Sequence, residues 1–553
     1  MKKLIFTILM LCSFGLTYSQ WISNYGATAG DVNFANAKGN AVTTDAGGYS
    51  YVTGFTSGAV SQNDIITIKY SPTGDTVWAR SYEGTAGLND EGTGICVDAY
   101  GNVYVVGTAQ FTGKSYDIVI LKYSSNGSFR WVNEYYAEDA PLQDKGMAIT
   151  VDANGFIYIT GFSTSNDGYN NIFTRKCDPE GNAIWSATED GSSHKDAQGL
   201  AIAVSPAGNV YVTGYVSASD GSTDIALYKY NSEGTCDWFR ILNSPAGSED
   251  KAWGIVVDDL DNVYIGGYVT VSSNNTDCYT AKYNSNGDLL WSKNFAGGGG
   301  STDKAWGIVV DTDGSVIITG ETTDASMNTN YITIKYSSTG QQLWTASYNG
   351  IGNGDDRAAS IGIIRNSDNS RSIVVTGKSW GTQANYDYAT VRYNCSNGVQ
   401  SQTSRYSFAG NSNDIAKDIA ISPNNKVFIT GFSQLIIDGP LAQSYISTLM
   451  FDWGASSELI TENNTPQSFT LHQNYPNPFN PSTSIKFELS EASDVKLAVY
   501  DMLGRENEVL INQYLSPGSY TFSFSGSNLS SGIYFYELKA GSYRDIKKMT
   551  LVK

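Results

Sequence analysis

Short apolar runs that end in glycine recur along most of the chain. GNVYVVG at 101–107 is typical, because β-branched and aromatic residues lead directly into Gly107. The same pattern ends at eight glycines, spaced 53 to 57 residues apart: Gly54, Gly107, Gly161, Gly214, Gly267, Gly320, Gly377 and Gly431. A nearly constant period of this size is typical of a solenoid, a propeller or an array of repeats.

Two further positions keep a constant distance from this glycine. Sixteen residues after it, the first seven copies place Tyr or Cys, directly preceded by a basic residue: Lys69, Lys122, Lys176, Lys229, Lys282, Lys335 and Arg392. Twenty-four residues after it, six copies place a tryptophan: Trp78, Trp131, Trp185, Trp238, Trp291 and Trp344. We interpret the basic residues as stems packed on a sheet with their charges outside.

The segment 86–131 serves as a model for one copy. Its pattern predicts strands at 95–98, 103–107 and 118–123 and a fourth strand around Trp131, separated by turns. Four short strands in about 50 residues match one propeller blade, whereas an immunoglobulin-type sandwich needs about 100 residues. Helical repeats are excluded because the apolar spacing is 2 or continuous rather than 3.6. The fold is therefore predicted to be an all-β propeller.

The two ends of the repeat region complement each other. WISNYG at 21–26 reads like a fourth strand with no first three before it. The last copy has strands near 415–421, 426–431 and 445–451 but no fourth. We expect the N-terminal strand to complete the last blade, which removes an exposed sheet edge. This predicts eight blades, with seven as the alternative because the seventh copy has GVQSQ at 398–402 instead of the tryptophan.

Two of the repeated sequence segments resemble a known family of repeats. VDAYGNVYVVG and VDANGFIYITG, each followed by a K-Y or K-C pair and by G-x-x-x-W, resemble the bacterial β-propeller repeat of secreted proteins. The resemblance covers roughly 30–450. We assign 20–454 to the propeller, as about eight repeats of about 53 residues.

The repeat pattern ends after Trp453. A polar linker is predicted at 455–466, followed by alternating strands that predict a small C-terminal β-sandwich. NPFNP, VYDMLGR, SSGIYFYEL and KKMTLVK resemble, in that order, the type A sorting domain of the type IX secretion system of Bacteroidetes-like bacteria. The resemblance covers 467–553. It implies that the type IX machinery is a partner and that the product, after the periplasm, is secreted or held at the outer-membrane surface.

The first residues and the charge agree with export. Lys2 and Lys3, an apolar run and Thr17-Tyr18-Ser19 predict a secretory signal peptide over 1–19. The leucine before Cys12 argues against a lipid anchor, and no later run is long enough to span a bilayer. A net charge of −19 argues against nucleic acid as a partner. The five cysteines left after cleavage have no spacing that predicts disulfides or zinc.

Candidate chemistry is sparse. With only His194 and His472, no catalytic triad or histidine metal site is predicted in the propeller, so we name no catalytic residue, no metal ligand and no cofactor. Seven aspartates precede the first strands: Asp90, Asp144, Asp196, Asp250, Asp303, Asp356 and Asp414. Turn capping is favoured for them, and a cation-binding ring is the alternative. A second set faintly resembles calcium loops, but hairpin turns are favoured: Asp98, Asp152, Asp258 and Asp311.

Positions that differ between copies are the candidates for function. The long loops between the second and third strands and between blades fall at one end of the ring, so this long-loop face is the expected binding face. There, Trp253 and Trp306 occupy equivalent positions of neighbouring copies. They could form a stacking platform for a ligand, or pack between blades with Ile255 and Val257.

The functional hypothesis follows from these observations. We interpret the protein as a secreted or cell-surface, non-enzymatic propeller that binds or scaffolds a glycan or protein ligand. The alternatives are a polysaccharide hydrolase or lyase that uses loop carboxylates, which would need two of them in one cleft, and a purely structural surface protein.

Overall fold

The computed structural model describes residues 19–552 apart from the short segments 27–35, 58–61, 86, 113–114, 136–141, 192, 245–247, 273–274, 299–301, 367–368, 383–384, 409–411, 437–441, 454–458, 463–467, 481, 492, 516–517 and 527–528. The predicted signal peptide, with Cys12, lies outside the described residues except for Ser19. The chain forms two compact units, one within Ser19–Phe451 and one formed mainly by Asp452–Lys553. Every regular element that is described is a β-strand.

The first unit is a series of four-stranded antiparallel sheets made of consecutive strands. The first four are β2 (Ala37–Thr44), β3 (Ser50–Ser57), β4 (Asn63–Tyr70) and β5 (Thr76–Tyr82); β6 (Glu91–Val97), β7 (Val103–Gln110), β8 (Tyr116–Tyr123) and β9 (Phe129–Tyr135); β10 (Asp144–Val151), β11 (Ile157–Thr164), β12 (Asn170–Cys177) and β13 (Ala183–Glu189); β14 (Ala197–Val204), β15 (Val210–Ser217), β16 (Thr223–Tyr230) and β17 (Cys236–Leu242).

The next three sheets repeat this order. They are β18 (Lys251–Val257), β19 (Val263–Ser272), β20 (Asn275–Tyr283) and β21 (Leu289–Phe295); β22 (Lys304–Val310), β23 (Val316–Thr323), β24 (Thr329–Tyr336) and β25 (Gln342–Tyr348); β26 (Arg357–Arg365), β27 (Arg371–Trp380), β28 (Tyr386–Asn394) and β29 (Gln400–Tyr406).

The last sheet of the unit combines both ends of its chain. It contains β30 (Ser412–Ile421), β31 (Val427–Ile436), β32 (Ala442–Phe451) and, as its outer strand, β1 (Ser19–Tyr25). β1 is antiparallel to β32, with Trp21 opposite Met450. The N-terminal strand therefore lies in the sheet for which its sequence predicts it.

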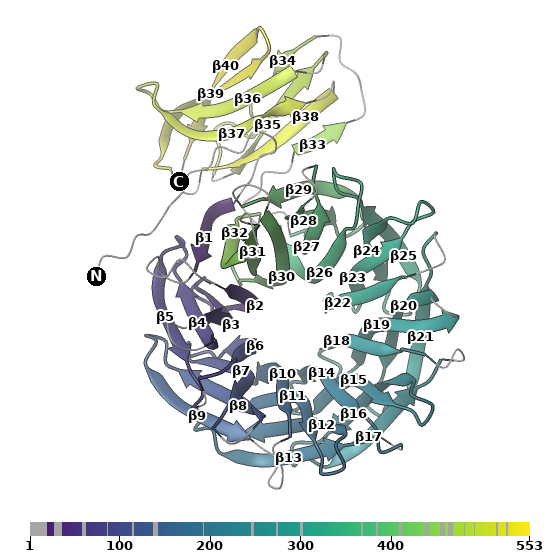
Figure 1. The fold of residues 1–553 in the computed structure, drawn as a ribbon. Helices are drawn as coiled ribbons and strands as arrows, with labels where there is room; N and C mark the ends of the chain where they lie inside the picture. Colours follow the sequence, from purple (N-terminus) through teal and green to yellow (C-terminus); the bar gives the residue numbers. More distant parts are fainter. Residues whose placement is uncertain are drawn as a thin grey trace. The chain divides into compact units, whose positions relative to one another are not determined.

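The sheets are arranged radially, with their first strands around a central opening (Figure 1). This is the arrangement of a β-propeller. The first and last sheets also contact each other: the backbone N–H of Ala37 donates to Ser444 Oγ at 3.0 Å, and Val52 shares an apolar cluster with Phe428 and Ile446.

Apolar faces of neighbouring sheets make the core. Ile65 of the first sheet packs with Val105, Val119 and Leu121 of the second, and all four are fully buried. Because strand side chains alternate between two faces, each central strand supplies both of its neighbours, which is why these strands read as continuous apolar runs. Full burial of one such side chain contributes about 1.5–3 kcal/mol.

The repeated tryptophan fastens each sheet to the next. Trp78, on β5, donates its indole N–H to the carbonyl of Ser125 in the turn between β8 and β9, at 3.2 Å. Its ring covers Gly127, which has a φ of +80°, and a Cβ on that glycine would lie 2.6 Å from the ring. We call this contact the tryptophan latch. Four more latches have the same hydrogen bond, from Trp185, Trp238, Trp291 and Trp344.

The same latch joins the last sheet to the first. Trp21 of β1 donates to the carbonyl of Pro72 at 3.3 Å and covers Gly74. The latch also explains why the seventh copy has no tryptophan. In that copy, Gln402 takes the position of the tryptophan, opposite Arg392. The third and fourth strands of the next sheet come from opposite ends of the chain, so no turn connects them and a latch there would have no glycine to cover.

The repeated lysines hold their charges inside the propeller, contrary to the prediction from the sequence. Lys69 and Lys229 are only 6% and 8% exposed, and each donates to the turn carbonyl that receives the neighbouring latch, at 3.1 Å. The Lys69 ammonium also lies 5.0 Å from the centre of the Tyr51 ring. Their charges are therefore inside the contact between sheets, and the expectation of outward charges was wrong. Burial lowers the pKa of Lys69.

The second unit is a β-sandwich. One sheet has the order β33 (Leu459–Glu462), β38 (Gly518–Ser525), β35 (Ser482–Leu489), β34 (Thr470–Leu471); the other has β37 (Glu506–Leu515), β36 (Ser493–Tyr500), β39 (Gly532–Ala540), β40 (Tyr543–Leu551). Phe487 and Phe522 of the first sheet share a buried core with Leu497 and Leu538 of the second. β33 falls inside the predicted linker, where its backbone pairs with β38.

The tryptophan latch predicts unequal effects at two turn glycines. Gly127 and Gly208 have φ of +80° and +82°, but a Cβ would meet the Trp78 ring only at Gly127 and nothing within 4 Å at Gly208. Both alanine variants carry the same backbone strain, so we expect Gly127→Ala to lower the free energy of unfolding by about 1–3 kcal/mol more than Gly208→Ala. Urea unfolding followed by tryptophan fluorescence measures the difference. Equal losses would show that the latch does not need the glycine.

Candidate functional site

The inner strands border the central opening and share a β-bulge. In β18 the pairing partner moves from Gly267 at Ala252 to Gly266 at Gly254, so Trp253 is the extra residue. The repeated glycine makes room for this bulge, because a Cβ on Gly267 would lie 2.0 Å from the carbonyl oxygen of Lys251. In the seven inner strands whose pairing is described, the register shift thus leaves one unpaired residue on the strand that lines the channel.

The two predicted tryptophans are both bulge residues. Trp253 of β18 and Trp306 of β22 are half-buried and contact each other edge to face, with ring centroids 5.2 Å apart. Tyr268 lies 6.2 Å from Trp306, and Lys304 Nζ sits 4.2 Å from the centre of the Tyr268 ring. Because each bulge is near the start of its strand, this aromatic group lies at the long-loop end of the channel.

Other bulge residues have different chemistry. Asn40 donates to the carbonyl of Gly92 at 2.9 Å, and Thr93 donates to the carbonyl of Gly146 at 2.7 Å, so each seals the contact with the next inner strand. A tryptophan side chain is too long to form this hydrogen bond in the same way. Trp253 instead contacts Trp306, which is the bulge residue of the next inner strand. The channel wall is therefore uneven around the ring.

The opposite end of the channel is apolar. A cavity of about 450 Å³ is lined there by the ends of several inner strands: Thr150, Ile202–Val204, Ile255–Val257, Val309, Val310 and Ile363. Aliphatic side chains without convergent polar groups give a ligand little to recognise, so the aromatic end is the stronger candidate site.

The aspartates before the inner strands cap loops, as favoured from the sequence. Asp90 accepts a hydrogen bond from the backbone N–H of Gln110 at 2.8 Å, and Asp250 accepts one from Thr270 at 2.7 Å. Asp144, Asp196, Asp303, Asp356 and Asp414 likewise accept backbone N–H groups. Within the described residues, no group of three or more His, Cys, Asp or Glu side chains is placed to hold a metal ion.

The second set of aspartates forms hairpin turns. Asp98 accepts the backbone N–H groups of Tyr100 and Asn102 and the hydroxyl of Tyr104, and two others repeat this arrangement: Asp152 and Asp258. Asp311 instead lies 3.6 Å from the buried Lys335. For Asp98, Asp152 and Asp258 the turns themselves occupy the carboxylate oxygens, which agrees with the favoured interpretation.

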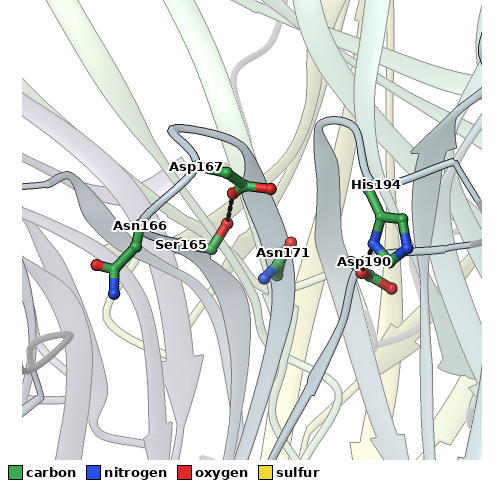
Figure 2. A pocket seen from close by; sticks show the side chains of 6 residues that line it. All are labelled: Ser165, Asn166, Asp167, Asn171, Asp190 and His194. Atoms are coloured by element: carbon green, nitrogen blue, oxygen red, sulfur yellow. Dashed lines mark hydrogen bonds and ion pairs between the residues drawn. The ribbon is translucent and has the colours of Figure 1, made fainter.

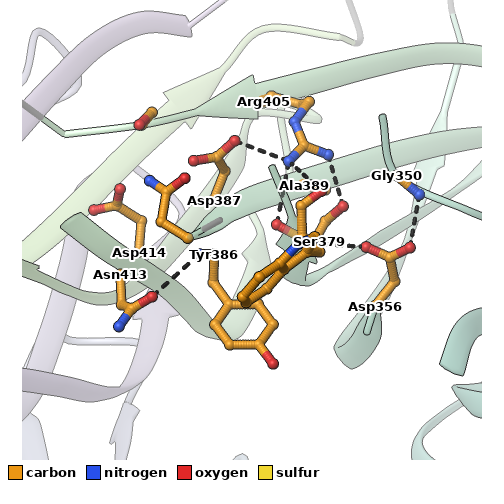
Figure 3. A network of polar contacts seen from close by, with 12 residues as sticks. Gly350, Asp356, Ser379, Tyr386, Asp387, Ala389, Arg405, Asn413 and Asp414 are labelled. Carbon is orange, nitrogen blue, oxygen red and sulfur yellow. Dashed lines mark hydrogen bonds and ion pairs between the residues drawn. The ribbon is translucent and has the colours of Figure 1, made fainter. Parts of the chain in front are cut away.

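A network of polar contacts surrounds Arg405 of β29 and reaches Tyr348 of β25 in the sheet before it (Figure 3). Its guanidinium donates to Asp387 Oδ2 at 2.8 Å, to Ser379 Oγ at 2.6 Å and to the Tyr348 hydroxyl at 3.1 Å. Asp356 lies beside it and accepts the N–H of Gly350 at 2.6 Å. Arg405 replaces residues such as Ser81 at the equivalent position, so the repeat pattern gives no signal for it. The network pairs the buried Asp387 carboxylate with a guanidinium.

A second pocket, of about 420 Å³, surrounds His194 (Figure 2). Nδ1 of His194 contacts Asp190, which gives this histidine an ion-pair partner that the sequence did not predict. Across the pocket, the Ser165 hydroxyl donates to Asp167. A nucleophilic serine needs a hydrogen bond to its base, and Ser165 directs its proton to a carboxylate instead. The pocket therefore lacks the arrangement of a hydrolase triad.

Comparisons with known families agree with both units. Residues 473–553 match the model of a secretion system C-terminal sorting domain, and residues 206–237 match that of a β-propeller domain of unknown function. The chain therefore carries propeller repeats followed by a type IX sorting domain, and is exported to the cell surface or the extracellular space. Among the described residues, no helix could cross a membrane. No curated protein matches the chain.

Solved structures with a similar fold have low identity. A protein of unknown function from Bacteroides caccae is 13% identical, with 54% of this chain and 94% of that one covered and a TM-score of 0.31. A quinohemoprotein alcohol dehydrogenase from Comamonas testosteroni is 10% identical, with 79% and 77% covered and a TM-score of 0.42. An α-L-arabinofuranosidase from Fusarium graminearum is 11% identical, with 55% and 92% covered and a TM-score of 0.33. Such distant likenesses do not identify an activity.

From the raised pKa values of Asp90 and Asp414 we predict that the free energy of unfolding depends on pH. Burial raises the pKa of Asp90 and Asp414 from 3.8 to about 6. The folded protein then holds protons that the unfolded chain has released, so the stability from these groups is complete below about pH 4 and is lost as the pH rises through 6. We expect the wild type to lose up to about 2–3 kcal/mol per aspartate over this window.

The matched variant isolates these groups from the rest of the acidic surface. In Asp90→Asn/Asp414→Asn neither position titrates, so the free energy of unfolding from urea titrations at pH 4, 5, 6 and 7 should fall less steeply than in the wild type. If the free energy of unfolding falls equally steeply with pH in both proteins, the pKa values of Asp90 and Asp414 are not raised.

Proposed function

We propose that the protein is an exported, eight-bladed propeller that binds a carbohydrate at the long-loop end of its channel without transforming it. Seven sheets of consecutive strands and an eighth that includes β1 support eight blades rather than seven. The Trp21 latch supports closure of the ring by the N-terminal strand. In this proposal 20–454 is the functional propeller and 467–553 is the sorting domain that the type IX machinery handles.

One observation supports carbohydrate binding above the others. Trp253 and Trp306 come from different sheets, yet the bulges bring them to an edge-to-face contact 5.2 Å apart on the channel wall. Partly exposed indole rings offer flat apolar faces to the C–H side of a sugar. A protein ligand that inserts an aromatic side chain could use the same surface, and is the second candidate.

The carboxylates support a binding role rather than hydrolysis. A glycosidase needs two carboxyl groups about 5–10 Å apart that face the substrate. In this propeller, the regular aspartates direct their oxygens to backbone N–H groups, as Asp250 and Asp303 do. A polysaccharide hydrolase or lyase remains the alternative function, and it would have to use carboxylates outside these two repeated sets.

A binding screen tests the proposal. With the mature chain on a glycan array, we expect wild type to bind and Trp253→Ala/Trp306→Ala to lose at least about tenfold in affinity, because the stacking surface is removed. The matched control is Phe129→Ala/Phe239→Ala, which removes two rings that are 50% and 55% exposed on outer strands. Its binding should equal that of the wild type.

Two results would contradict the proposal. Equal binding by the double tryptophan variant would move the site away from the channel. Release of reducing sugar from a bound polysaccharide would make the protein an enzyme and favour the alternative.

A further inference from the structure

The contact between the sixth and seventh sheets holds an amine against a thiol. Lys335 of β24 is 5% exposed and, like Lys69 and Lys229, donates to the turn carbonyl that receives the latch, here that of Cys395 at 3.2 Å. Its ammonium also contacts the side chain of the same residue, with Nζ 3.1 Å from Sγ. Cys395 is 4% exposed. The two reactive groups therefore face each other inside a dry contact between sheets.

Two departures from the repeat bring this pair together. In the first five sheets the lysine lies opposite a tyrosine, as Lys69 lies opposite Tyr51, whereas Lys335 lies opposite Ile317. The ammonium thus has no tyrosine ring beside it on its own sheet. The turn of the seventh sheet also differs, because Cys395 stands at the position that is serine in four other turns: Ser125, Ser232, Ser285 and Ser338.

A carboxylate completes the group. In the second sheet, Asp98 accepts the hydroxyl of Tyr104, but the tyrosine at the equivalent position is missing from the sixth sheet. Asp311 instead lies 3.6 Å from Lys335 Nζ and 3.5 Å from Cys395 Sγ, and is 6% exposed. A proton acceptor therefore lies beside both reactive atoms.

The distance between nitrogen and sulfur favours one kind of covalent bond over another. Single bonds between atoms of this size are about 1.5–2 Å long, so two of them that meet at one oxygen span roughly 2.5–3 Å. That span is close to the observed 3.1 Å between Nζ and Sγ. A direct nitrogen–sulfur bond would need the atoms to approach by more than about 1 Å in a packed contact.

The destination of the protein supplies an oxidising environment. The sorting domain directs export to the cell surface or the extracellular space, where thiols are no longer kept reduced. All five cysteines among the described residues are free thiols. Hydrogen peroxide converts such a thiol to a sulfenic acid, which then reacts with a neighbouring group.

We propose that Lys335 and Cys395 become joined through one oxygen atom, as a covalent Nζ–O–Sγ bridge, when the exported protein is oxidised by hydrogen peroxide. The first peroxide oxidises the thiol to the sulfenic acid and leaves as water. Lys335 gives one proton to the Asp311 carboxylate, which later releases it to solvent. The second peroxide takes one hydrogen from the amine, the hydrogen of the sulfenic acid and two electrons, and leaves as two waters while the N–O bond forms.

The bridge would join two sheets at a useful place. It connects β24 of the sixth sheet to the turn before β29 in the seventh, where Trp344 already donates to the carbonyl of Cys395 at 3.0 Å. The next contact around the ring, between the seventh and eighth sheets, has Gln402 at the latch position. A covalent bond therefore reinforces the latch that precedes the contact without a tryptophan. This role is independent of the proposed carbohydrate binding.

The reaction is expected to be slow at neutral pH. Burial raises the pKa of the Cys395 thiol, whereas the hydrogen bond and charge of Lys335 act against that rise and Asp311 adds to it. Peroxide attacks the thiolate rather than the thiol, so the bridge should form faster as the pH is raised.

Mass spectrometry of the mature chain tests the proposal. After peroxide treatment at mildly alkaline pH, we expect the intact mass to rise by about 14 Da, for one oxygen gained and two hydrogens lost. Tryptic digestion should then yield a peptide pair that links the segment around Lys335 to the segment around Cys395. Dithiothreitol should restore the original mass. The oxidised protein should also unfold at a higher urea concentration than the reduced protein.

Three variants show whether the bridge needs both groups. Cys395→Ser restores the residue of the other turns, and Lys335→Arg introduces the residue that the seventh copy has at this position, Arg392. Both should lose the linked peptides and the shift in urea midpoint. The control, Cys236→Ser, removes a half-buried thiol from β17 and should form the bridge as wild type does. Thermal unfolding midpoints establish that each variant is folded.

The wild-type protein alone can overturn the proposal. Oxidation of Cys395 to a sulfinic or sulfonic acid with Lys335 unmodified would show that the two groups do not react with each other. An unmodified Cys395 after treatment would have the same meaning. Linked peptides with a loss of about 2 Da would replace the oxygen bridge by a direct nitrogen–sulfur bond and contradict the argument from distance.

Discussion

The structure depends on a contact that repeats between sheets: an indole on the outer strand of one sheet rests on a turn glycine of the next. The latch explains why Trp78 and Gly127 keep their places in the repeat, since the ring needs a residue without a Cβ beneath it. The indole N–H and the ammonium of Lys69 share one carbonyl, that of Ser125, so the same turn is held twice. Each sheet alone exposes an apolar face, and the latch aligns that face with its partner.

A single repeated glycine links this scaffold to the candidate site. Gly267 allows the bulge in β18, and the bulge releases one residue from the ladder while the rest of the strand stays paired. The residue at this position differs from sheet to sheet, as the series Thr93, Leu200, Trp253 and Lys417 illustrates. The scaffold is therefore uniform, whereas the channel wall differs from sheet to sheet. The aromatic pair Trp253 and Trp306 arises from this variation.

Much of the fold could be predicted from spacing, because glycine and tryptophan repeats report local geometry and nearest-neighbour contacts. The sequence of the N-terminal segment resembles a fourth strand, which predicts its place in the last sheet, and β1 pairs with β32 as expected. Predictions failed where a neighbouring sheet decides the outcome. The Lys69 charge is buried by the next turn, and β33 is a strand because its backbone pairs with β38. The Arg405 network could not be predicted because it brings together side chains that the repeat does not align.

The latch of Trp21 joins strands from the two ends of the propeller. Hydrogen exchange on wild type and Trp21→Ala measures how far these strands depend on that contact, since local opening reports which strands a contact stabilises. We expect faster exchange in two regions far apart in sequence, 37–82 and 412–451, with β14–β21 unchanged. Faster exchange confined to β1 itself would show that the ends are held together without the latch.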